Sequence, residues 1–557
     1  MGDILYQPLK TGQIRLLKFH PGEIEDRIYC EMRNISLDNK PDYFALSYVW
    51  GTILNHTKIS LNGHELEIGK NLYIAINHLR THEERFTSHF VWIDALCINQ
   101  KDNAEKAQQV GQMDDIYSHA QTTIAWLGVP QPADEHYYEI LFDILSQGPR
   151  SCYGYSLSEL IVPRILLMTQ EELQDPRKEV FLGAKRCIEQ LLVNPWFDRC
   201  SYSDLYKAPP ATLNRSDYLH VFTRMHALEQ LSDWATKRGL GFGRPGPEAN
   251  EIVAGDQLLE LLDSTARRHC TIPHDTIYGV LGLWHHVRRQ ELPQELTPNY
   301  DIPYADVCQQ YSAYLLAHTR DLRIITKRTP TFNTKVPSWV PDLGCIDMRA
   351  DGHQIFHTKR AQVRISPNGQ ELLLKGRHFA SVIDGIASFT QLRGPHTSGS
   401  IFWNLITQRI TEFENMILKP AMQYKGITVE AGRSQFLALT DCMNSYDLLR
   451  NHDMELSSSG QGFDIPSEEL EDITGILNKT MILMDSGHVL FADGEAVYAK
   501  PGDQVIVCEG DNFQFLILRP SDMGQQLIQT GRYDISSFGF GFGEYIANKV
   551  VEEFTIV

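Results

Sequence analysis

At 557 residues and 63.6 kDa, the chain is long enough for about two to four domains, and its formal net charge of −19 would repel a phosphate backbone, so nucleic acid is not an expected partner. No segment approaches the roughly 18 to 20 consecutive apolar residues that cross a bilayer, so we expect no membrane span. The 10 cysteines include no Cys-x-x-Cys pair, which favours a reducing, cytoplasmic location over a zinc ribbon or a disulfide framework.

Strand and helix patterns alternate through the first third of the chain. YFALSYVW at residues 43–50 is an aromatic and apolar run that predicts a buried strand. KISLNGHELEI at residues 58–68 carries Asn62-Gly63 between two alternating segments, which predicts an inserted β-hairpin with a type I′ turn. Residues 71–84 then have apolar side chains at helical spacing, so we expect a helix there.

A second strand, a second helix and a third strand follow. Residues 90–97 predict the strand, and Asp102 with Glu105 three residues later forms a capping-box pattern, so a helix should run from residue 103 to about residue 119. Its expected apolar stripe consists of Val110, Met113, Ile116, Tyr117 and Ala120. Residues 122–127 complete a β-α-β-α-β pattern, which is typical of an α/β domain on a parallel sheet with right-handed crossovers.

The rest of the chain changes character twice. Residues from about 130 to 300 are mostly helical in pattern, whereas short strand-like runs separated by turn residues recur from about residue 335. We therefore predict an N-terminal α/β domain at 1–200, a mostly helical region at 201–335, and a β-rich C-terminal module at 336–557. The module should be a barrel or a sandwich with a helical insertion at about 400–455.

Three blocks of the N-terminal region resemble the fungal heterokaryon-incompatibility (HET) domain. They are YFALSYVWG at 43–51, VWIDALCINQ at 91–100 with Glu105, and the Met-x-x-Ile-Tyr-x-x-Ala segment at 113–120 leading into IAWLG. PHDTIYGVLGL at 273–283 resembles a later piece of long HET-domain proteins. The resemblance implies non-self recognition after hyphal fusion, with growth arrest and cell death as the outcome. It also implies likeness to the TIR domain, a flavodoxin-like module with NAD-cleaving members.

Polar side chains follow the predicted strands, at the edge of a parallel sheet where ligands bind in α/β folds. The candidate residues are Trp50, Gly51, Asp94, Asn99, Gln100 and Glu105. Asp94 or Glu105 could stabilise an oxocarbenium-like centre or orient ribose hydroxyls, while Trp50 could stack on a ring. The two amide side chains, those of Asn99 and Gln100, could read amide or hydroxyl groups.

Each candidate also has a structural interpretation. Asp94 can cap backbone amides, Glu105 can be the partner in the capping box, and Trp50 can cover the edge of the core. Cys97 has no histidine placed by the sequence to activate it, and small buried cysteines are common. No metal site and no resident cofactor are predicted.

Two classes of function remain open. In the first, the protein is an interaction-driven effector that forms homo-oligomers or binds another incompatibility factor. In the second, it is a TIR-like enzyme of the NAD glycohydrolase kind, which cleaves NAD or another nucleotide. Recruitment of a HET-like protein to a fungal metabolic pathway is a further alternative. After Trp196-Phe197-Asp198-Arg199 the chain lacks the Gln-Glu pair usual in the family, which favours the first class.

Overall fold

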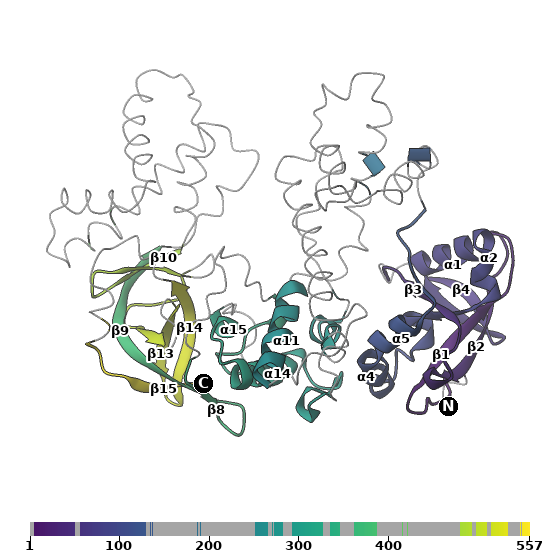
Figure 1. The fold of residues 1–557 in the computed structure, drawn as a ribbon. Coiled ribbons are helices and arrows are strands. Elements are labelled where there is room, and N and C mark those ends of the chain that lie inside the picture. Colours follow the sequence, from purple (N-terminus) through teal and green to yellow (C-terminus); the bar gives the residue numbers. More distant parts are fainter. Residues whose placement is uncertain are drawn as a thin grey trace, which may run out of the picture. The chain divides into compact units, whose positions relative to one another are not determined.

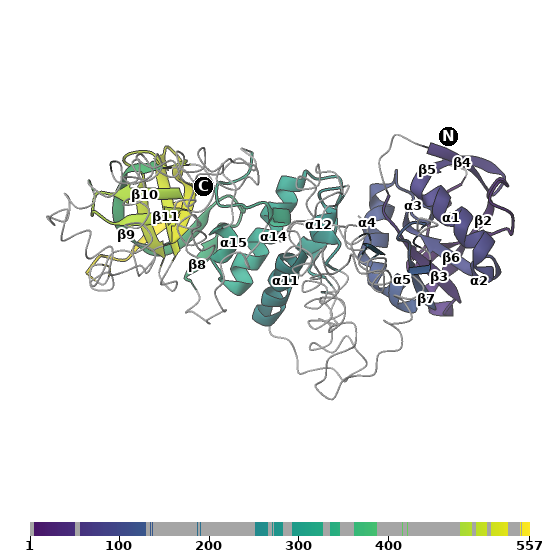
Figure 2. The ribbon, with the colours of Figure 1, turned by 90° about the horizontal axis from the view of Figure 1, so that it is seen from above.

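In a computed structural model the chain divides into two compact units, whose helices and strands are drawn in Figures 1 and 2. One unit comprises residues 1–247 and 264–302, and the other comprises residues 248–263 and 303–557. Apart from isolated positions, the structure describes residues 5–50, 56–129, 251–265, 272–281, 292–326, 335–345, 361–386, 480–492, 497–508, 514–532 and 548–557.

A seven-stranded mixed sheet forms the centre of the first unit. Its strands are β1 (Gln13–Phe19), β2 (Tyr29–Ser36), β3 (Tyr43–Ser47), β4 (His56–Leu61), β5 (His64–Gly69), β6 (Phe90–Ile93) and β7 (Thr122–Ala125), in the order β5-β4-β2-β1-β6-β3-β7. The three strands predicted to be parallel neighbours, β6, β3 and β7, are so paired. The α/β prediction is confirmed for this part of the sheet.

The sheet is not purely parallel, because β1 pairs antiparallel with both β2 and β6. The loop at 20–28 joins β1 to β2 and is too short for a crossover helix, so these two strands can pair side by side only in opposite directions. The predicted hairpin is confirmed: β4 and β5 are antiparallel, and Asn62 and Gly63 between them have φ angles of 48° and 80°. Positive φ at both positions is the requirement of a type I′ turn.

Short helices pack on the sheet of the first unit. They are η1 (Leu37–Asn39), α1 (Lys70–His82), α2 (Glu84–Ser88), α3 (Asp94–Cys97), α4 (Asn103–Gly111) and α5 (Met113–His119). The single helix expected over 103–119 is divided at Gln112, whose φ and ψ of −118° and 17° are not helical. Ile116 is fully buried, and Met113 and Tyr117 pack against the core, as the stripe predicted.

The division gives α4 a buried face that is polar. Its buried side chains are those of Glu105, Lys106 and Gln109, whereas Val110 stays partly exposed. The apolar stripe therefore belongs to α5, and α4 is held in place by hydrogen bonds and charges. The first unit also includes two later elements, α12 (Asp275–Tyr278) and η3 (Gln294–Leu296).

The second unit combines helices with a β-rich module. Its helices are α11 (Glu251–Thr265, most of which lies in this unit), α14 (Tyr304–Thr319), α15 (Arg323–Thr326) and η4 (Leu343–Cys345). Its strands are β8 (Val363–Ile365), β9 (Leu372–Ile386), β10 (Thr480–Met484), β11 (Val489–Ala492), β12 (Gln504–Cys508), β13 (Gln514–Ser521), β14 (Gly524–Arg532) and β15 (Glu552–Ile556). Within the described ranges, no helix has both the length and the apolar character needed to cross a membrane.

The β-rich module is a closed antiparallel barrel. The sheet runs β10-β11-β14-β13-β12-β9, and the ring closes because β9 pairs with β10 as well as with β12. Gly376 of β9 allows the close approach of β12, since a Cβ there would lie 2.8 Å from the Val507 carbonyl oxygen. Apolar side chains such as Phe379 and Phe515 fill the interior. The helical insertion expected at about 400–455 falls almost wholly outside the described residues.

Candidate functional site

The carboxyl ends of β6, β3 and β7 lie at one edge of the sheet because these strands are parallel. Their register pairs Leu46 with Ile93 and Ser47 with Ala125. The segments that follow the three strands therefore start side by side. In α/β folds, this edge is where loops gather around a ligand.

Trp50 and Asp94 contact each other at this edge. The Trp50 indole Nε1 donates a hydrogen bond to Asp94 Oδ2 at 3.0 Å, and the Asp94 side chain is 7% exposed. The other carboxylate oxygen, Oδ1, accepts from the amide of Ala95 at 2.7 Å, and the Gln100 side chain donates to the Asp94 carbonyl at 3.0 Å. The Asp94 carboxylate thus accepts hydrogen bonds from both the Trp50 indole and the Ala95 amide. Gly51, which follows Trp50, lies outside the described residues.

Asn71 of α1 links the loop after β3 to the loop after β7. Its Nδ2 donates to the Val49 carbonyl at 2.6 Å, and its Oδ1 accepts from Trp126 Nε1 at 3.3 Å. The ring of His78 lies 5.4 Å from the Trp126 ring. The sequence prediction did not include these residues, although Trp126 lies near the end of a predicted strand as Trp50 does. We call Trp50, Asn71, Asp94, Gln100 and Trp126 the strand-end cluster.

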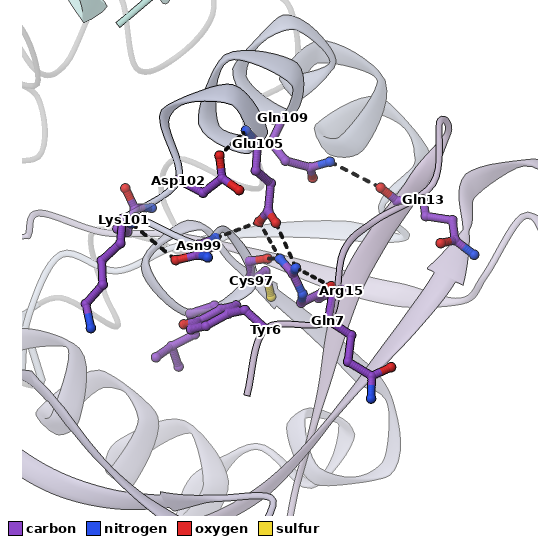
Figure 3. Close-up of polar contacts among 12 residues, drawn as sticks. Tyr6, Gln7, Gln13, Arg15, Cys97, Asn99, Lys101, Asp102, Glu105 and Gln109 are labelled. Carbon is purple, nitrogen blue, oxygen red and sulfur yellow. Dashed lines mark hydrogen bonds and ion pairs between the residues drawn. The ribbon is translucent and has the colours of Figure 1, made fainter. Parts of the chain in front are cut away.

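Glu105 and Asn99 belong to a different cluster, which is centred on Arg15 of β1 (Figure 3). Arg15 is fully buried, and its Nη1 and Nη2 donate to Glu105 Oε1 and Oε2 at 2.5 and 2.8 Å. Glu105 Oε1 also accepts from the Asn99 amide at 2.7 Å. Both oxygens of the carboxylate are therefore occupied by donors from the protein itself, in a bidentate geometry that fixes the side chain.

Arg15 also ties two backbone segments to β1. It donates to the carbonyls of Cys97 at 2.9 Å and Gln7 at 2.7 Å. Its guanidinium lies 5.0 Å from the centre of the Tyr6 ring, whose hydroxyl donates to the Leu96 carbonyl at 3.2 Å. A sequence signal for this centre exists, because Arg15 is a charge within the apolar run IRLLKF and needs a buried partner.

The capping-box pattern forms only its first half. Asp102 Oδ1 accepts from the amides of Ala104 and Glu105 at 3.0 and 3.1 Å, so Asp102 is the N-cap residue of α4. The Glu105 side chain turns to Arg15, while the Asp102 amide donates to the Asn99 carbonyl at 3.0 Å. The candidate residues are thus divided between the strand-end cluster and the Arg15 centre, and the single turn of α3 connects the two.

Cys97 at the end of α3 is fully buried. Its Sγ accepts from the Ile93 amide at 3.3 Å. Burial raises the pKa of the Cys97 thiol far above its ordinary value, so the sulfur stays protonated and unreactive as a nucleophile. Among the described residues, no group of three or more His, Cys, Asp and Glu side chains is placed to hold a metal ion. The Trp196–Arg199 block lies outside them.

The barrel of the second unit carries an open groove of about 470 Å³. Its polar lining includes His378, Gln504, Gln525, Glu552 and Glu553. Glu553 is paired with Arg364 at 2.8 Å, and Gln525 donates to Gln504 at 2.9 Å. None of the residues predicted for a site lies in this groove.

Comparison with known proteins places the N-terminal motifs in a family. Residues 43–200 match the family described as "Heterokaryon incompatibility protein (HET)". The chain is 39% identical over 129 residues to "Heterokaryon incompatibility protein 6, OR allele" of Neurospora crassa, a match that covers 21% of this chain and 19% of that protein. The chain thus spans about a fifth of the length of this relative, and no solved structure matches it. The motif blocks and the family match agree in placing a segment similar to the fungal HET domain at residues 43–200.

Proposed function

We propose that the protein acts in fungal heterokaryon incompatibility, as an effector of non-self recognition that triggers growth arrest and cell death. The observation that carries the proposal is the HET match over residues 43–200, together with the likeness to a protein named for heterokaryon incompatibility. In this role the HET domain binds another incompatibility factor or a second copy of the chain in the cytoplasm. The rest of the chain supplies the recognition.

The strand-end cluster is the part of the domain that we propose as the binding surface. Trp50 is half-buried and its indole nitrogen donates to the buried Asp94, so the edge carries an aromatic ring that a carboxylate holds in place. Aromatic side chains of this kind provide much of the contact energy in protein interfaces and ligand sites. Glu105 and Asn99 support the cluster because the hydrogen bond between them fixes the loop that carries Gln100.

The test is overexpression in a fungal host, with growth scored against the amount of soluble protein. We expect the parent chain to impair growth, and Trp50→Ala and Asp94→Ala to weaken the effect at unchanged abundance. Asp42→Ala, which changes a carboxylate that is 62% exposed, is the matched control and should behave as the parent. Glu105→Ala should lower abundance as well as toxicity, because it leaves the Arg15 charge buried without its partner.

Two outcomes would contradict the proposal. An abundant parent chain without effect on growth would argue against the effector role. Toxicity that follows abundance alone in all variants would show that the strand-end cluster is scaffold.

A TIR-like enzyme that cleaves NAD is the second candidate. It is favoured by the position of the Asp94 carboxylate and the Trp50 indole at the carboxyl ends of parallel strands, where α/β folds bind nucleotides. Incubation of the purified protein with NAD decides the question: nicotinamide release that Asp94→Asn abolishes would support the enzyme. The missing Gln-Glu pair after Arg199 places the interaction role first.

A further inference from the structure

A segment beyond the HET match folds with the N-terminal domain. It consists of residues 272–281 and 292–302, which belong to the first unit, and we call it the downstream segment. Its two parts are joined by polar contacts. The Tyr278 hydroxyl donates to the Asn299 carbonyl and accepts from the Asn299 amide, both at 3.0 Å, and His274 Nε2 lies 2.8 Å from the Ile302 carbonyl oxygen. The rings of Tyr278 and Tyr300 meet edge to face at 5.2 Å.

The downstream segment contacts the first turn of α4 through its consecutive residues Tyr300 and Asp301. The Lys106 ammonium lies 4.9 Å from the centre of the Tyr300 ring, a cation–π contact, and the Lys106 side chain is 9% exposed. Next to it, Asn103 Nδ2 donates to Asp301 Oδ1 at 2.7 Å. The buried position of Lys106 matters because an ammonium removed from water needs a favourable electrostatic environment.

Asp275 supplies the opposite charge. The Tyr300 hydroxyl donates to Asp275 Oδ1 at 2.6 Å, so the tyrosine lies between the carboxylate and the ammonium. Burial raises the pKa of Asp275, while the Tyr300 hydrogen bond and the charges of Lys106 and His274 act in the opposite direction. Lys106, Tyr300 and Asp275 therefore form an electrostatic unit whose members come from both sides of the contact; Lys106 is buried, and the other two side chains are partly buried.

The contact continues through α4 toward the strand-end cluster. Glu105, the neighbour of Lys106, is bound to Arg15 and to the Asn99 amide. Gln100, the residue after Asn99, donates to the Asp94 carbonyl. Hydrogen bonds thus connect α4, the loop at 99–100 and α3 in one series.

We propose that the downstream segment is a conformational latch on the HET domain. While docked, it fixes α4; when it is displaced, α4, the loop at 99–100 and Asp94 loosen together. A factor that binds the downstream segment would in this way act on the strand-end cluster. The proposal concerns coupling within the chain and does not depend on the function assigned above.

Hydrogen–deuterium exchange of the full chain, followed by mass spectrometry, tests the latch. Lys106→Met keeps an apolar stem of similar length and removes the charge. We expect exchange to accelerate together in residues 292–302, 103–111 and 94–100, by roughly five- to thirtyfold, which is the factor for losing about 1 to 2 kcal/mol. Lys101→Met, an exposed lysine five residues earlier, is the matched control and should leave all three peptides as in the parent.

A second variant keeps the test decisive if Lys106→Met does not fold. Tyr300→Phe retains the ring over the ammonium and removes only the hydroxyl that binds Asp275. The same three peptides should again exchange faster together, by a smaller factor. Faster exchange confined to the downstream segment, or no change in any peptide, would overturn the proposal.

Discussion

Arg15 and Glu105 show how a buried charge is accommodated at the level of single residues. The pair is 0% and 9% exposed; both carboxylate oxygens and both terminal nitrogens, Nη1 and Nη2, have hydrogen-bond partners, whereas the buried Arg15 Nε has none. Removing two ions from water is costly, and only a bidentate geometry with further hydrogen bonds offsets that cost. The pair therefore positions the segments that it joins, and its loss should be felt as loss of stability.

Glu105→Gln tests this interpretation. The amide keeps an acceptor for Asn99 but leaves the Arg15 charge buried without a counter-charge, so the free energy of unfolding should fall by about 3 to 5 kcal/mol. Denaturant unfolding of the purified chain measures the change. Glu31→Gln makes the same substitution in a pair with Arg33, whose side chains are 47% and 62% exposed, and should leave the unfolding midpoint unchanged. Equal effects of the two substitutions would contradict a special role for the buried pair.

At the level of elements, glycine favours the native backbone in the β4–β5 turn and disfavours it in helix α4. Gly63 occupies the β4–β5 turn at φ 80°, a region that side chains with a Cβ rarely adopt. Gly111 closes α4, and a Cβ there would meet no atom within 4 Å. A Cβ at Gly63 would also meet no atom within 4 Å. The effect of adding a side chain at these two positions is therefore decided by the backbone conformation and not by steric contact.

Replacing each of these glycines with alanine should change stability in opposite directions. Gly63→Ala should cost about 1 kcal/mol through strain, whereas Gly111→Ala should stabilise by about 0.5 to 1 kcal/mol because alanine loses less freedom in a helix. Thermal unfolding of the two variants beside the parent gives the sign of each change. A stabilising Gly63→Ala would show that the hairpin does not use a type I′ turn.

At the level of the whole molecule, the first unit is assembled from parts far apart in the sequence. Lys106 of α4 contacts Tyr300, and Tyr300 contacts Asp275, so the first unit includes residues that lie beyond the HET match at 43–200. The second unit closes its barrel in the same manner, since β9 pairs with β10 across the residues between 386 and 480. Such contacts are formed at the expense of chain entropy and require complementary surfaces.

The dependence of stability on the titration of Asp275 should report on its contact with Tyr300 and Lys106. Because burial raises its pKa, the folded chain binds this proton more tightly than the unfolded chain does. The stability contributed by the group is complete below the ordinary pKa of aspartate and is lost as the pH rises through the raised value in the folded state. Asp275→Asn removes that dependence, so the melting temperature of the variant relative to the parent should rise as the pH is increased from the ordinary pKa of aspartate into the range above it. A constant difference across this range would contradict the burial of the carboxylate.

The sequence by itself determined the local features of the fold. The apolar runs predicted β3, β6 and β7 with their parallel pairing, Asn62-Gly63 predicted the turn, and Asp102 predicted the start of α4. These features depend on backbone preferences and on side-chain periodicity within a few residues, and both are readable from neighbouring positions. The three motif blocks also lie within the range that matches the HET family, residues 43–200.

Only the tertiary structure decided which polar side chains act together. The sequence around Glu105 is compatible both with a capping box and with an ion pair to Arg15. The side chain binds Arg15, because a buried guanidinium without a counter-charge costs more free energy than an unsatisfied amide at the start of a helix. In the same way, β1 joins an otherwise parallel group of strands in the opposite direction, and Lys106 of α4 is covered by Tyr300. These outcomes depend on contacts between residues tens to hundreds of positions apart, about which local periodicity carries no information.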